Sequence, residues 1–480
     1  MSSLLANLSA AECDLASSWL ACPVHNTRED IRRLFDCYRS GEQESGKAWW
    51  PTIYTDGRAY SEQDFRLLKS YLLDKLEAWL AYKQWSFNRL PQVDPFLLDA
   101  YRQRGLERHF INRLKRARRT LKSRPTTDLW TAYQIETQEF DLAAGSKRLE
   151  AHNLEERDQL LDAAVLRMKL RAACQTLSTY TLKGKRDEIA LLSECLALAD
   201  QPIFSAIPGI KAYSLACTML LEPDGGDVHF ESFYRLITEQ LDHFPTSEQR
   251  DLLRLGINFC VGRINQEQFE FLSPSLALYR LAINRKLIYQ AGEISPFTFN
   301  NVVGIALRLG ENDWAEQFLN TQCVYLPDDK RASLTAFNTA RLALAKEDYE
   351  GVLVALREDY YKDFIQQMNA RVLKLKAYWS LELYHLLESH IRNTRSLLRR
   401  KQKTSYHVQN FKNLFDLSDQ LLRLPPGPGK GKEKLHSMIS KTEPLTERAW
   451  LLDQLHFNVA IGLVCTTISC LSTMGAQLFG

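Results

Sequence analysis

Three aromatic residues recur at equal intervals in the second half of the chain. Trp314, Tyr349 and Tyr384 are each separated by 35 residues. A repeat of this length corresponds to one pair of helices, and a single pair cannot bury its apolar face unaided, so successive pairs must stack. The spacing therefore predicts stacked helix pairs over residues 298–392.

The amino-acid composition extends this expectation to the whole chain. Gly (21) and Pro (16) are few among 480 residues, since average usage would give roughly 58 of the two together. Turns are therefore scarce, and the chain lacks the alternating Val, Ile and Thr runs that mark strands. A single core stops growing at about 250–300 residues. We therefore predict an all-α fold class with an elongated helical-repeat architecture, an α-α superhelix or solenoid.

The junctions inside the helix pairs resemble those of a known repeat class. Asp313-Trp314 and Asp348-Tyr349 each join a preceding helical segment to a following one, and the third unit has Leu383 in place of Asp. This arrangement resembles the tetratricopeptide-repeat (TPR) class, whose unit has about 34 residues. The resemblance implies a TPR-like fold.

More narrowly, the chain resembles an uncharacterised bacterial family of long all-helical proteins. The resemblance covers about 450 residues and implies a fold, with no biochemical activity attached to it. The segments that carry it are ACPVHN, ISPFTFNNVVGIALRLGENDWAEQFL, FNTARLALAKEDYEGVLVAL, SLLRRKQK and TEPLTERAWLLDQL.

Helix-start signals and composition divide the chain into six segments. Ser9 with Glu12, and Thr27 with Asp30, have the spacing of a capping box at a helix N-terminus. The predicted segments are an N-terminal helical domain (1–90), a helical region with a basic helix at 102–124 (91–200), irregular helical repeats (201–297), TPR-like repeats (298–392), C-terminal helices (393–456) and an uncharged apolar tail (457–480).

The TPR resemblance also implies a ligand groove. In regular TPR proteins the first helices of successive pairs line a concave surface that holds an extended peptide. Five side chains would line this groove, and Arg341 or Lys376 would hold a carboxylate of the peptide. A purely structural role in helix packing is the alternative. The five residues are Phe337, Asn338, Arg341, Lys376 and Trp379.

Residues 102–124 are strongly basic, with ten Lys/Arg and Glu107 as the one acid. An apolar stripe from Leu106 to Leu121 indicates that the same helix docks on the protein. Three roles stay open: a solvated or interhelical charged face, a surface for an acidic protein, and a nucleic-acid site. The same roles apply to a second basic cluster at 392–403. The patch proposed for an anionic partner is Arg108, Arg113, Lys115, Arg116, Arg118 and Arg119.

Motifs of enzyme chemistry are missing from the sequence. It has no HExxH, no GxSxG, no Walker loop and no Cys/His quartet, so we name no catalytic, metal-binding or cofactor-binding residue. The net charge of +3 gives no global bias toward nucleic acid or membranes. The ten cysteines are scattered without a CxxC, a spacing typical of reduced thiols in a cytosolic protein.

The last 24 residues, 457–480, contain no charged side chain. They are long enough to cross a bilayer but include several Ser and Thr, so a membrane anchor, a packed helix and a poorly ordered extension stay open. Together these observations predict a non-enzymatic, cytoplasmic scaffold that binds an unidentified protein or peptide. A nucleic-acid-binding regulator using 102–124 and 392–403, and a membrane-tethered scaffold held by 457–480, are the alternatives.

Overall fold

The computed structural model describes residues 2–40, 45–87, 89–122, 128–145, 153–183, 188–222, 226–357, 363–400, 405–425, 427 and 429–456. Within these residues the regular structure is helical, apart from one isolated β-bridge between Gln290 and Glu293. The predicted all-α class is thereby confirmed. Backbone contacts group the chain into two compact units, of which unit 1 comprises 1–172 and 191–210, and unit 2 comprises 173–190 and 211–480.

Unit 1 holds the first eight helices, two short later ones and part of two shared helices. α9 and α12 each contribute residues to both units. The helices are α1 (Ser2–Ala6), α2 (Ala10–Ala21), α3 (Glu29–Arg39), α4 (Gly46–Ile53), α5 (Glu62–Phe87), α6 (Arg89–Gln103), α7 (Glu107–Lys122), α8 (Leu129–Gly145), α9 (Leu154–Lys183), α10 (Leu192–Ala199), α11 (Pro202–Ser205) and α12 (Pro208–Leu221).

One of the two predicted capping boxes forms. The Ser9 side chain accepts from the backbone N–H of Glu12, whose carboxylate accepts from the Ser9 backbone N–H at 2.8 Å, and α2 begins at the next residue. The second prediction is wrong, because α3 begins at Glu29 with Arg28 at its N-cap and no side-chain cap. The Asp30 carboxylate instead accepts from the Arg28 guanidinium and from the hydroxyl of Tyr54.

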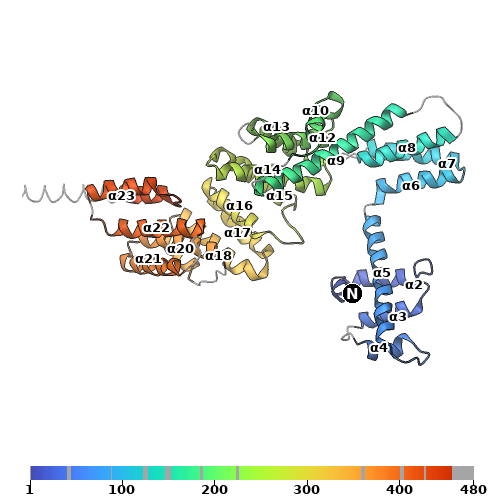
Figure 1. The fold of residues 1–480 in the computed structure, drawn as a ribbon, viewed down its shortest axis with the longest axis horizontal. Helices are drawn as coiled ribbons and strands as arrows, with labels where there is room; N and C mark the ends of the chain where they lie inside the picture. The colour runs from blue at the N-terminus through green and yellow to red at the C-terminus, as the bar shows by residue number, and fades with distance from the viewer. Residues whose placement is uncertain are drawn as a thin grey trace, which may run out of the picture. The chain divides into compact units, whose positions relative to one another are not determined.

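Helices α6, α7 and α8 lie side by side, as Figure 1 shows. Leu98, Phe110, Leu114, Ala117 and Ile135 form the core between them. The predicted single basic helix at 102–124 is corrected, because α6 ends at Gln103 and α7 begins at Glu107. Gly105 lies between them with φ +65°, a conformation that glycine adopts without the steric cost of a side chain.

Unit 2 consists of helices, several of which are joined by turns of a few residues. Its helices after α12 are α13 (Gly226–Gln240), η1 (Leu241–His243), α14 (Thr246–Asn265), η2 (Phe269–Phe271), α15 (Leu272–Asn284), α16 (Pro296–Arg308), α17 (Asn312–Gln322), η3 (Cys323–Tyr325), α18 (Asp328–Ala345), α19 (Tyr349–Ala355), α20 (Phe364–Ser380), α21 (Tyr384–Arg399), α22 (Tyr406–Leu422) and α23 (Lys430–Lys441), followed by a helical segment at 448–456.

The first helices of three successive pairs end in the same way. Gly310, Glu347 and Glu382 follow α16, α18 and α20 with φ of +75°, +59° and +55°. In each case the next residue donates its N–H to a carbonyl five positions earlier: Glu311 to Ala306, Asp348 to Ala343, and Leu383 to Tyr378. This is the Schellman ending of a helix. The backbone therefore repeats where the side chains differ.

Contacts between first helices connect these pairs. α16 packs against both α17 and α18, and α18 packs against both α19 and α20. Phe337, Ala340, Val352 and Ala370 belong to one buried cluster that joins α18, α19 and α20. Each pair therefore buries its apolar face against the next.

The C-terminal helices cover the apolar side of the α20–α21 pair. Leu375 of α20, Phe415 of α22 and Leu451 of the 448–456 segment belong to one buried cluster. Two asparagines of α22 bind the backbone just before that segment. Asn413 Nδ2 donates to the carbonyl of Pro444 at 2.8 Å, and Asn410 Oδ1 accepts from the N–H of Thr446 at 2.5 Å. The 448–456 segment is therefore part of the core.

Candidate functional site

Phe337, Asn338 and Arg341 lie on the side of α18 that meets α16. Asn338 is fully buried, and its Nδ2 donates to Asn300 Oδ1 at 2.7 Å and to the Leu334 carbonyl at 2.9 Å. Arg341 Nη1 donates to the Asn300 carbonyl and to Asn338 Oδ1, both at 3.0 Å. Asn338 is thus a structural residue that fixes the position of Arg341.

Arg341 is a half-buried cation without a carboxylate partner among the described residues. Its guanidinium lies 5.7 Å from the centroid of the Phe337 ring. Burial, with a smaller effect of the nearby Arg308, lowers the pKa of Arg341 to about 10, because desolvation and like charge both disfavour the protonated form. Nε and Nη2 donate to no group in the described part of the chain. Two donors of a fixed fork are therefore available.

The neighbouring helix makes room for this side chain. A Cβ atom placed on Gly304 of α16 would collide with Nη2 of Arg341. Arg308, one turn further along α16, is exposed and lies over the Phe269 ring at 5.5 Å. Arg308 and Arg341, from adjacent helices, therefore repel each other, and neither forms an ion pair in the described structure. An anionic group would relieve their repulsion.

Lys376 and Trp379 lie in α20, in a different setting. Lys376 Nζ lies 2.6 Å from Glu447 Oε2, and the Trp379 ring meets the Trp450 ring edge-on at a centroid distance of 5.7 Å. The chain's own C-terminal residues therefore occupy the positions that a peptide would contact there. The five predicted groove residues therefore form two groups. Phe337, Asn338 and Arg341 include a guanidinium with free donors, whereas Lys376 and Trp379 contact other residues of the same chain.

Two members of the predicted anionic-partner patch serve the interior of unit 1. Arg113 pairs with the buried Asp94 at 2.5 Å. Arg118 pairs with the carboxylates of Glu136 and Glu139, and Glu136 is buried. Arg118 itself is half-buried. Both arginines join α7 to neighbouring helices, so they are not free for an anionic partner.

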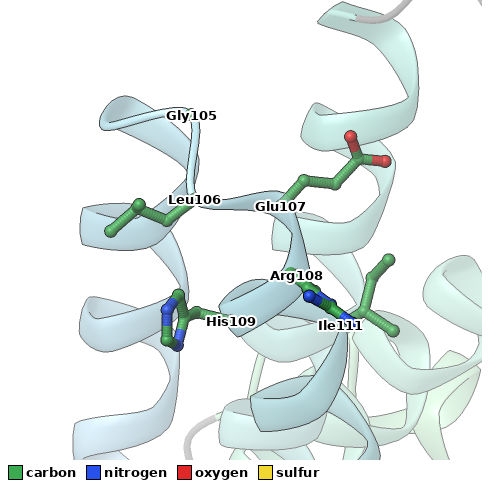
Figure 2. A pocket seen from close by; sticks show the side chains of 6 residues that line it. All are labelled: Gly105, Leu106, Glu107, Arg108, His109 and Ile111. Atoms are coloured by element: carbon green, nitrogen blue, oxygen red, sulfur yellow. The ribbon is translucent and has the colours of Figure 1, made fainter.

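The remaining cations of α7 face outward. Arg108, Lys115, Arg116, Arg119 and Lys122 are exposed and have no ion-pair partner among the described residues. We call these five residues the α7 basic row. Its start borders a shallow hollow of about 430 Å³, which is lined by Gly105, Leu106 and the first turn of α7. Figure 2 shows Arg108 and Ile111 on one side of the first turn of α7 and His109 on the other.

Two arginines of the second basic cluster, Arg392 and Arg395, form ion pairs. Arg395 pairs with Asp416 at 2.6 Å and with Asp419 at 2.7 Å, and Arg392 lies 3.3 Å from Glu388. Arg399 and Arg400 are exposed at the end of α21. Lys401 and Lys403 lie outside the described residues. The acids that pair with Arg395 belong to α22 and lie more than twenty positions away in the sequence, so the sequence alone could not predict this pairing.

A hollow in the N-terminal helices was not predicted. Trp19, His25, Trp79, Tyr82 and Lys83 line a space of about 500 Å³ between α2 and α5. The Trp19 and His25 rings stack at a centroid distance of 3.5 Å, and Trp19 Nε1 is buried without a hydrogen-bond partner in the described structure. The three-residue spacing of Trp79 and Tyr82 on α5 was the available signal, and it reads equally as core packing.

Two further findings concern metals and membranes. The described residues contain no group of three or more His, Cys, Asp or Glu side chains placed to hold a metal ion. None of the helices in the described ranges is long and apolar enough to cross a bilayer. The tail at 457–480, on which the membrane-tether hypothesis rests, lies outside the described residues. Comparison of the chain with protein-family models, curated proteins and solved structures finds no match.

Proposed function

We propose that the protein is a non-enzymatic scaffold that binds an acidic segment of another protein through unit 2. The proposed architecture of this unit is a TPR-like helical repeat. Three observations support it: the 35-residue spacing, the contacts between the first helices of successive pairs, and the repeated Schellman ending of α16, α18 and α20.

One observation carries the proposed binding role. Arg341 is half-buried, is oriented by Asn300 and Asn338, and has no carboxylate partner in the described structure. A buried cation is costly unless an anion joins it. Its free Nε and Nη2 have the fork geometry that receives a carboxylate in two parallel hydrogen bonds. An Asp or Glu side chain, or a C-terminal carboxylate, is therefore the proposed ligand group, with Arg308 adding attraction.

We propose that the chain is a relative of the bacterial all-helical proteins that its sequence resembles and that it acts in the cytoplasm. The scattered cysteines support this compartment, since thiols persist in a reducing environment. The partner in this proposal is a protein or peptide, and no cofactor takes part.

A displayed library of random peptides tests the binding role. The full chain should enrich peptides rich in Asp and Glu, and Arg341→Met should abolish this enrichment while the fold stays intact. Arg254→Met is the matched control, because Arg254 is an exposed arginine of the same unit, on α14, paired with Asp251 at 3.3 Å. Equal enrichment by the wild-type chain and Arg341→Met would exclude Arg341 as the carboxylate site.

A further inference from the structure

The α7 basic row is a straight line of charge. Arg108, Lys115, Arg119 and Lys122 are seven, four and three residues apart. At 100° per residue these intervals put all four within a sector of about 60°, and a rise of 1.5 Å per residue spreads them over about 21 Å. Arg116 lies beside this line. The exposed Asn112 lies about 20° outside this sector.

The opposite side of α7 is fixed to the protein. Phe110, Leu114 and Ala117 are buried in the core with α6 and α8. The inward cations Arg113 and Arg118 have acids from those helices at ion-pair distance. The cations of the α7 basic row have no acid at ion-pair distance within the described ranges. Like charges at three- and four-residue spacing repel each other. A rigid scaffold therefore presents five cations whose repulsion only an external anion removes.

The shape of the row selects among polyanions. A stable protein interface needs buried aromatic or aliphatic anchors, and the row offers only Ile111 at its edge. A basic helix that binds an anionic membrane inserts its apolar face among the lipids, and the apolar face of α7 is buried in the core with α6 and α8. A nucleic-acid backbone is itself a line of evenly spaced charges, and its binding depends on the number of phosphates neutralised.

The residues around the α7 basic row favour a nucleic-acid duplex over a single strand. Proteins that bind single strands stack the bases on exposed aromatic rings. The row contains no aromatic residue, and the nearest ring on α7, His109, packs against Tyr101 at a centroid distance of 5.6 Å. A duplex has already stacked its bases and needs only phosphate contacts. We propose that the outer face of α7 binds the phosphodiester backbone of a nucleic-acid duplex without reading its sequence.

Fluorescence anisotropy with labelled DNA and RNA duplexes of unrelated sequence tests this inference on the full chain. Binding should be similar for all sequences and should weaken with salt, with a slope near −4 in log K against log salt if most of the five cations each neutralise one phosphate. Lys115→Glu/Arg119→Glu should weaken binding at least about tenfold at low salt and reduce the slope by about 2. A comparison of the DNA and RNA arms identifies the preferred duplex.

The matched control is Lys211→Glu/Lys330→Glu, which changes the net charge by the same amount at two exposed lysines, of α12 and α18, that lie outside both basic clusters. This control should change duplex affinity by less than about twofold, and circular dichroism should show both variants folded. Equal losses in the two variants would overturn the inference, because net charge alone would explain binding. Absence of duplex binding at low salt would overturn it too. So would tighter binding of poly-glutamate or phosphatidylserine vesicles with the same dependence on Lys115 and Arg119.

Discussion

The guanidinium of Arg341 lies in the space that a Cβ atom would occupy on Gly304 of the adjacent helix. A glycine inside a helix costs about 0.5–1 kcal/mol relative to alanine. At this position the missing side chain lets Arg341 reach the Asn300 carbonyl, 3.0 Å from Nη1. A side chain at Gly304 would therefore have two different effects: it would change the stability of α16, and it would displace the guanidinium of Arg341.

Gly304→Ala should therefore stabilise the protein and weaken peptide binding. The nearest atom to the new methyl is the end of a flexible side chain, so Arg341 can swing aside while α16 gains up to about 1 kcal/mol of helix propensity. Urea unfolding and binding of an acidic peptide measure the two effects. Gly262→Ala in α14 is the control, since nothing lies within 4 Å of its added Cβ. It should stabilise without affecting binding. Unchanged binding by Gly304→Ala would contradict the proposed role of Arg341.

Glu347→Gly should raise the free energy of unfolding by about 1 kcal/mol, because a non-glycine residue with a left-handed backbone carries a cost of this order. Glu347 has φ +59°. Urea denaturation measures the change. Glu350→Gly, three residues later and inside α19, should instead destabilise, since glycine weakens an ordinary helical position. A loss of stability in Glu347→Gly would show that its side chain contributes more than the backbone conformation costs.

Glu136→Gln should destabilise the protein at neutral pH and much less in acid. Burial alone would raise the pKa of Glu136, but hydrogen bonds from Arg118 and Asn153 outweigh it and lower the pKa. The folded pKa then lies below the unfolded value of about 4.3, so the carboxylate stabilises the fold above that pH and loses this effect as the pH falls.

Urea unfolding at pH 7 should show a loss of about 1–3 kcal/mol for Glu136→Gln, with a smaller loss at a pH below the unfolded pKa. Glu139→Gln is the control, because Glu139 is more exposed and binds the same arginine. It should cost less than about 1 kcal/mol. A pH-independent loss in Glu136→Gln would point to packing in place of charge.

Alkylation with iodoacetamide should modify Cys174 and Cys260 last. Burial raises the pKa of the Cys174 thiol well above its usual range and that of Cys260 to about 12, and the thiolate is the reactive form. The half-buried Cys13, Cys22, Cys195 and Cys323 should react before them. Mass spectrometry of timed samples measures this order, and urea should abolish it. Native labelling of Cys260 as fast as Cys323 would contradict the burial.

Local sequence patterns were enough to predict the helical class and several helix starts. Trp314, Tyr349 and Tyr384 all fall within the first three residues of α17, α19 and α21. The box at Ser9 forms because its two partners are three residues apart and need nothing else. The box at Thr27 does not, because Asp30 finds Arg28 and Tyr54, and Tyr54 is 24 residues away.

The candidate sites could be predicted only in part, because charge pairing depends on tertiary contacts. Arg113 and Arg116 look equivalent in the sequence, yet one pairs with a buried acid of α6 and the other faces outward. Likewise Leu383 gave no capping signal, while the backbone around it repeats that around Asp348. Those turns depend on backbone hydrogen bonds, which residue identity does not record.

The helical segment at 448–456 has a consequence for the length of the array. A stack of helix pairs with a bare terminal face can add further copies end to end, and natural arrays avoid this with a dedicated last unit. Here Leu451 and Leu455 complete the core that Leu375 and Leu387 begin. Leu451 and Leu455 therefore cover the apolar side of α20 and α21 on which another helix would otherwise pack.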